Sequence, residues 1–131
     1  MQDFRKVRVW QKAQAQAVAI HRLLQSFPKR GFSRLKTQMQ KSSEAIADTI
    51  AEGCGAVTQP ELARFLAMSL RESTELESQL DRAFKVGLIS RPKFDAYTNE
   101  VRTIRKMTVG YRKAVVRTYE QDGQLIDDER S

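Results

Sequence analysis

The chain has 131 residues, of which 40% are hydrophobic and 30% charged, and its formal net charge at pH 7 is +7. This size is typical of one domain with a modest core, and no apolar run approaches the roughly 20 residues that a membrane span needs. The one cysteine, Cys54, has no second cysteine to pair with, and the basic N-terminus lacks the apolar stretch of a signal peptide. We therefore expect a cytoplasmic protein.

The first predicted helix covers residues 9–26. A repeat near 3.5 residues places one seam of a helix against its neighbours. Pro28 and Gly31 then end the pattern, because proline removes a hydrogen-bond donor and glycine relaxes the backbone. The apolar and small residues of this seam recur with gaps of three and four, at Trp10, Ala13, Ala17, Ile20 and Leu24.

Glycine and proline mark the ends of the second and third predicted helices. The second helix begins near Ser33 and ends at Gly53, since the run Gly53-Cys54-Gly55 is typical of a helix C-terminus. The third helix begins at Pro60, where a missing N–H is tolerated in the first turn, and stops at Gly87.

The fourth predicted helix runs from the N-cap Ser90 to about Thr118. Residues 120–131 are acidic and lack periodicity, which predicts a disordered tail. The fourth helix has the longest seam, at Phe94, Tyr97, Val101, Ile104, Thr108, Tyr111 and Val115.

These elements predict an all-α fold. Short connections favour antiparallel neighbours, so we expect an up-down-up-down antiparallel four-helix bundle over residues 1–119, followed by the acidic tail, residues 120–131. The apolar surface is wider than one seam requires, and large exposed apolar patches usually mark interfaces. We therefore expect a homo-oligomer rather than a monomer with scattered exposed apolar residues. The predicted interface residues are Phe65, Met68, Leu70, Met107 and Val109.

Several short motifs carry a family resemblance. The first helix contains Val9-Trp10-Gln11-Lys12-Ala13, the second ends in Ile50-Ala51-Glu52-Gly53, and the third closes with Ala83-Phe84-Lys85-Val86-Gly87. In this order and spacing they resemble the bacterial four-helix-bundle proteins known as 23S rRNA intervening-sequence proteins. The chain departs from the family at Ala45-Ile46-Ala47-Asp48-Thr49, where Ser-Ile-Pro-x-Asn is usual, and at Arg71-Glu72, where Gly-Ser is expected.

The resemblance implies an up-down bundle that assembles as a ring, commonly a pentamer. Distantly similar proteins are accessory variability proteins of diversity-generating retroelements, in which a basic ring surface binds nucleic acid and the reverse transcriptase. The family has no well-defined biochemical role. The resemblance therefore implies an assembly with a binding surface rather than a reaction.

Basic charge is concentrated in the first and last helices. Residues 1–41 hold ten Lys/Arg against one acid, and residues 91–119 hold eight against two. Such a field favours polyanions such as nucleic acid, and the alternative is a solvated surface without a ligand. No aromatic residues alternate with these bases, so stacking on single strands is not predicted. The predicted nucleic-acid-binding residues are Arg5, Lys6, Arg8, Lys12, Lys29, Arg30, Arg34 and Lys36.

No pattern typical of an enzyme or a metal site occurs in the sequence. Cys54 and His21, the sole Cys and His, are expected near opposite ends of a helix pair, beyond the reach of a nucleophile and its base. One Cys and one His do not make a structural zinc site. We expect no catalysis, no metal and no cofactor.

The sequence thus predicts a non-catalytic, ring-forming four-helix bundle that binds RNA or DNA through a basic surface and offers a surface to a partner protein. The alternative is a protein-interaction adaptor with no nucleic-acid role.

Overall fold

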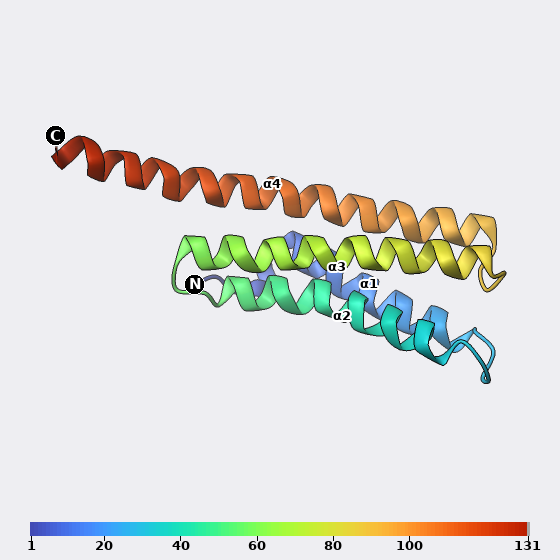
Figure 1. Ribbon diagram of the computed structural model, residues 1–131. Helices are drawn as coiled ribbons and strands as arrows, with labels where there is room; N and C mark the ends of the chain where they lie inside the picture. The colour runs from blue at the N-terminus through green and yellow to red at the C-terminus, as the bar shows by residue number, and fades with distance from the viewer. Residues whose placement is uncertain (131) are drawn as a thin grey trace.

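Four helices in up-down-up-down order make up the molecule. Each helix runs antiparallel to the one before it (Figure 1), and no strand is present among residues 1–130. The prediction of an all-α, antiparallel four-helix bundle is confirmed. The computed structural model describes the backbone of residues 1–130 and the side chains of residues 1–122. A 3-10 turn (Phe4–Lys6) precedes α1 (Arg8–Gln25), α2 (Ser33–Cys54), α3 (Gln59–Lys85) and α4 (Arg91–Arg130).

The helix ends follow the turn signals of the sequence. Thr58 caps α3, since its side chain accepts a hydrogen bond from the backbone N–H of Glu61 at 3.3 Å. The Ser90 hydroxyl accepts from the N–H of Lys93 at 3.4 Å at the start of α4. Gly87, with φ +84°, makes the turn between α3 and α4. The predicted starts and ends of the first three helices lie within about two residues of the observed ones.

The core is built from the predicted seams. Apolar side chains from all four helices are fully buried, and hydroxyls on the seams donate to backbone carbonyls of their own or a neighbouring helix. The hydroxyl of Ser69 donates to the carbonyl of Ile46 at 3.0 Å, and that of Thr108 to the carbonyl of Ile104 at 2.8 Å. The largest buried core residues are Ile20, Met39, Ile46, Ile50, Leu66, Leu76, Leu80, Val101 and Ile104.

Gly53 allows the end of α2 to approach the start of α3 closely. A Cβ atom at this position would lie 2.9 Å from Cδ1 of Leu62 and 3.0 Å from Cβ of Phe65. Both distances are shorter than ordinary van der Waals contacts. The two helices can therefore lie this close only because residue 53 has no side chain. This explains the glycine in the motif Ile50-Ala51-Glu52-Gly53.

Helix α4 is longer than predicted. It continues to Arg130, whereas the sequence places its end near Thr118, and it extends past the end of the other three helices (Figure 1). Pro and Asn are missing between Thr118 and Arg130, and the lone Gly123 does not end the helix there. Glu120 and Asp122 are exposed on this helix. The side chains of residues 123–131 lie outside the described residues, so a disordered tail over residues 120–131 stays a prediction.

The described helices include none that is long and apolar enough to cross a membrane.

Candidate nucleic-acid interface

The N-terminal residues are fixed at the end of the bundle where α2 ends. The backbone N–H of Gln2 donates to the carbonyl of Cys54 at 2.9 Å. The Tyr111 hydroxyl of α4 donates to the Gln2 side chain, so this part of α4 also contacts the N-terminal segment. Burial, and the neighbouring Cys54, raise the pKa of Tyr111 to about 12, so its hydroxyl keeps its proton at neutral pH. These contacts place Arg5, Lys6 and Arg8 at one end of the bundle.

The three bases at this end are exposed. The guanidinium of Arg5 lies 4.9 Å from the centre of the Phe4 ring and 3.9 Å from the Asp3 carboxylate. Lys6 and Arg8 have no carboxylate partner among the described residues. They are therefore available to an anion.

Helix α4 adds basic side chains to the same end. Arg112 donates to the carbonyl of Ala63 at 3.1 Å, whereas Lys113 and Arg117 are exposed and form no ion pair within the part of the chain whose side chains are described. Because Tyr111 contacts Gln2, these two residues follow closely on the helix segment that the N-terminus touches. We call the five exposed residues here the basic end: Arg5, Lys6, Arg8, Lys113 and Arg117.

The sequence prediction omits Lys113 and Arg117. The signal was present, because residues 101–119 contain six Lys/Arg and no acid. Two of the six, Arg102 and Arg105, are held by Glu77 of α3, at 3.1 Å and 2.6 Å. The sequence alone does not tell which bases of this run are paired.

The structure divides the eight predicted residues into separate groups. Lys12 forms an ion pair with Glu100 of α4 at 3.2 Å, and the Lys36 ammonium donates to the carbonyl of Pro28 at 2.9 Å. Lys29 and Arg30 are exposed on the connection between α1 and α2. This connection lies at the opposite end of the bundle from the N-terminus (Figure 1).

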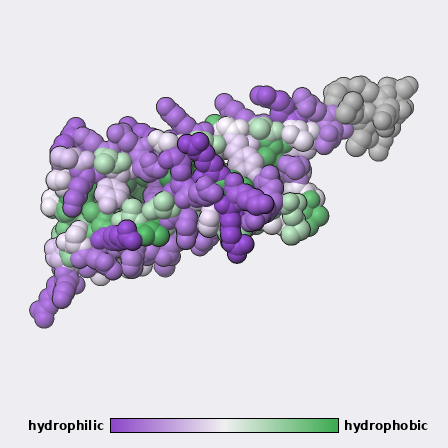
Figure 2. All heavy atoms as spheres, turned by 180° about the vertical axis from the view of Figure 1, so that it is seen from behind, coloured by the Kyte–Doolittle hydropathy of each residue, from purple (hydrophilic) through white to green (hydrophobic). Residues whose placement is uncertain are grey.

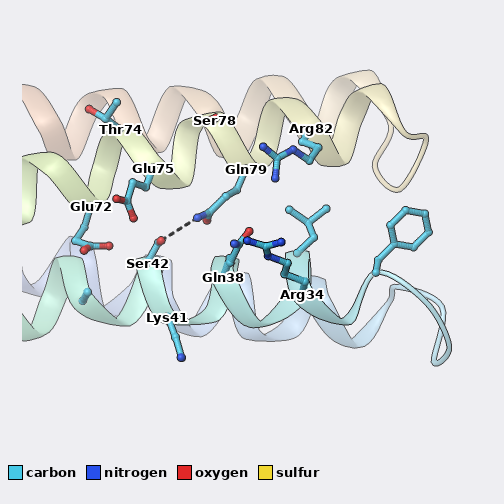
Figure 3. Close-up of a pocket in the computed structure, with 13 residues that line it drawn as sticks. Arg34, Gln38, Lys41, Ser42, Glu72, Thr74, Glu75, Ser78, Gln79 and Arg82 are labelled. Atoms are coloured by element: carbon cyan, nitrogen blue, oxygen red, sulfur yellow. Dashed lines mark hydrogen bonds between the residues drawn. The ribbon is translucent and has the colours of Figure 1, made fainter.

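Arg34, the last of the eight, lies in a groove between α2 and α3. The groove has a volume of about 1000 Å³, and we call it the α2–α3 groove. Figure 3 shows Arg34 on the α2 wall and Arg82 on the α3 wall, at the same end of the groove. Lys41 also borders the groove, but its side chain points away from α3.

The middle of the α2–α3 groove is neutral and its other end is acidic. The Gln79 side-chain N–H donates to the Ser42 hydroxyl at 3.1 Å, while the amide oxygen of Gln79 is buried without a partner among the described residues. Glu72 and Glu75 lie beyond this pair (Figure 3). Burial, and the charge of Glu75, raise the pKa of Glu72 above its ordinary value.

The five predicted interface residues are all partly buried in the single chain. Met107 packs against the core, and Phe65 lies beneath the guanidinium of Arg64, 4.8 Å from its ring centre. Hydrophobic patches interrupt a largely hydrophilic surface on the face that Figure 2 shows. An oligomer interface through Phe65, Met68, Leu70, Met107 and Val109 stays a prediction.

Other candidate residues have structural partners. Trp10 and Phe4 pack edge to face, with ring centres 4.8 Å apart. His21 is within hydrogen-bond distance of Gln40, 3.3 Å away, and Gln40 precedes Cys54 by about 21 Å along α2. Burial raises the pKa of Cys54.

Among the residues with described side chains, no group of three or more His, Cys, Asp or Glu is placed to hold a metal ion.

Comparison with known proteins agrees with the fold. The family model described as 23S rRNA-intervening sequence protein matches residues 5–110. A crystal structure of a protein with unknown function from the S23 ribosomal protein family of Bacteroides thetaiotaomicron superposes with a TM-score of 0.76 at 23% identity, covering 80% of this chain and 98% of that one. No curated protein matches the chain.

Proposed function

The chain belongs to the family of 23S rRNA-intervening sequence proteins, and we propose that it is a non-catalytic, ring-forming four-helix bundle that binds RNA or DNA through its basic end. The observation that carries this proposal is that exposed bases from two distant parts of the chain lie toward the same end of the bundle: Arg5, Lys6, Arg8, Lys113 and Arg117. Exposed Lys and Arg bind nucleic acid through its phosphates, largely independently of sequence.

We also propose that the chain assembles into a ring, a pentamer as the family resemblance implies. Each subunit of a ring presents its own basic end, so one strand contacts several of them and binds with avidity. Leu70 and Val109, partly exposed in the single chain, are suited to the contact between subunits because aliphatic residues gain stability when they are buried. Surfaces that stay exposed on the assembled ring are open to a partner protein, which the ring scaffolds.

Paired substitutions test the role of the basic end. Lys6→Gln combined with Arg8→Gln removes two phosphate contacts. We expect affinity for a labelled single-stranded RNA to fall about tenfold at moderate salt, and the slope of log K against log salt to flatten by about 1.4, at roughly 0.7 per phosphate. Fluorescence anisotropy across a salt series measures both quantities.

The matched control is Arg22→Gln with Arg71→Gln. Both arginines are exposed, lie away from the basic end, and form no ion pair among residues 1–122, so the net charge changes equally. Equal losses in the two variants would indicate a general charge effect and contradict a defined interface. Unchanged binding in both variants would contradict the basic end as the interface, and no binding by the wild-type protein at low salt would favour the adaptor function, in which a protein is the partner.

A further inference from the structure

Two arginines from different helices border the same end of the α2–α3 groove. Arg34 is in the first turn of α2 and Arg82 in the last turn of α3. Both are exposed, and neither pairs with a carboxylate within residues 1–122. Two guanidiniums facing one groove repel each other unless an anion lies between them, and guanidinium geometry suits phosphate.

The backbone adds to this preference for an anion. Helix α2 begins here without a side-chain cap, so the N–H groups of its first turn are open to a ligand. Its N-cap residue, Phe32, adopts φ +55° and borders the groove with its side chain 45% exposed. The sequence does not predict stacking on single strands, but the groove brings an exposed aromatic ring beside two arginines, a surface on which an unpaired base stacks.

Polar groups suited to a sugar follow deeper in the groove. Gln79 is 8% exposed, points into the groove, and has an unpartnered amide oxygen. Glu75 is about 10 Å along α3 from Arg82, at 1.5 Å per residue. Carboxylates accept hydrogen bonds from ribose hydroxyls, but they repel a second phosphate, so a strand that continued in this direction would be rejected.

We propose that the α2–α3 groove binds a ribonucleoside 5′-phosphate with a free 2′,3′-diol, the chemistry found at the 3′ end of an RNA strand and in a free nucleoside monophosphate. Arg34 and Arg82 hold the phosphate, and Gln79 and Glu75 receive the ribose. Upstream nucleotides leave over Phe32 toward Lys29 and Arg30. For RNA, this deepens the proposed function and rests on it.

The test compares three single-stranded RNAs labelled at the 5′ end and differing only at the 3′ end: a hydroxyl, a phosphate, or a 2′,3′-dideoxy nucleotide. We expect the hydroxyl form to bind about tenfold more tightly than the other two, the size of a lost hydrogen bond to a charged group. Arg34→Gln with Arg82→Gln should abolish this preference. Arg22→Gln with Arg71→Gln should preserve it, and circular dichroism checks that each variant is helical.

A second experiment distinguishes binding of a single nucleotide in the groove from binding of an RNA strand. AMP is titrated into ¹⁵N-labelled protein while the side-chain amide signal of Gln79 is followed. RNA binding that is indifferent to the 3′ end, with no AMP shift at Gln79, overturns the groove assignment and leaves the proposed function standing. A Gln79 shift with AMP and no RNA binding supports the groove as a nucleotide site and overturns the proposed function. If the protein binds no RNA and AMP does not shift the Gln79 signal, both the groove assignment and the proposed function are overturned.

Discussion

Glu77 illustrates how a single residue joins two helices. Its carboxylate on α3 accepts from Arg105 of α4 at 2.6 Å and from Arg102 at 3.1 Å. Burial acts to raise the pKa of Glu77, but the two arginines outweigh it and hold the pKa below the usual value. Arg105 also donates to the Ser73 hydroxyl at 3.1 Å. These contacts of Arg105 with α3 fix the position of α4 along α3 and also neutralise the Glu77 carboxylate.

Replacing Glu77 by Gln should make stability less dependent on pH. Because the pKa of Glu77 is lowered on folding, its carboxylate stabilises the fold above the ordinary carboxyl pKa, and this gain is lost as pH falls through the lowered pKa. We expect Glu77→Gln to cost about 1 kcal/mol of unfolding free energy at pH 7, since the network is partly exposed. The difference from wild type should narrow as pH falls below the ordinary Glu pKa of about 4.3 and close below the lowered pKa. Urea unfolding between pH 3 and pH 7 measures it.

Glu52→Gln is the control for this experiment. Glu52 is exposed and forms no ion pair within the described side chains. A stability difference for Glu77→Gln that stays constant with pH would show that the ion pair is not its cause.

At the level of residues, the core could be predicted from the sequence and the groove could not. Ile20 and Ile104 are buried where the 3.5-residue repeat places them. Arg34 and Arg82, by contrast, are 48 positions apart in the sequence and meet only because α2 and α3 are antiparallel. Lys12 was predicted to bind nucleic acid because it lies in a basic segment, but it forms an ion pair with Glu100. No local sequence pattern reveals a partner 88 residues away.

At the level of elements, the helix ends were predictable wherever proline or glycine acts locally. Pro60 lies in the first turn of α3, and Gly87 makes the turn just after α3 ends. The end of α4 was not predictable in this way. The acidic composition after Thr118 predicts disorder, whereas the sequence contains no strong helix breaker before Arg130. An acidic composition indicates that a segment buries little surface, but it does not by itself interrupt a helix that is already formed, and α4 continues to Arg130.

Two glycines within helices should respond oppositely to alanine. At Gly53 the new methyl group meets Leu62 and Phe65 at about 3 Å, so we expect Gly53→Ala to destabilise by about 1–3 kcal/mol through overpacking. At Gly110 nothing lies within 4 Å of the new Cβ, so Gly110→Ala should stabilise by up to about 1 kcal/mol through helix propensity. Thermal unfolding by circular dichroism at equal concentration compares them. Stabilisation by both substitutions would contradict the close α2–α3 approach.

At the level of the whole molecule, basic residues lie at both ends of the bundle. The basic end lies on the side of the bundle where the chain begins, and the opposite end, about 27 Å away by the length of α1, carries Lys29, Arg30, Arg34 and Arg82. One subunit therefore carries two separate basic surfaces rather than a continuous one, and we propose that each binds an anion. A ring repeats each surface around its axis, which fits a role in holding a strand along several subunits.

The most direct test of nucleic-acid binding is the salt dependence of wild-type affinity for a labelled single-stranded RNA, measured by anisotropy from 50 to 200 mM salt on protein of known mass from light scattering. With five exposed bases at the basic end, the account predicts an oligomer and a slope of about −3 or steeper, at roughly −0.7 per neutralised phosphate. A slope no steeper than about −1, or no binding at the lowest salt, would contradict phosphate recognition by this surface.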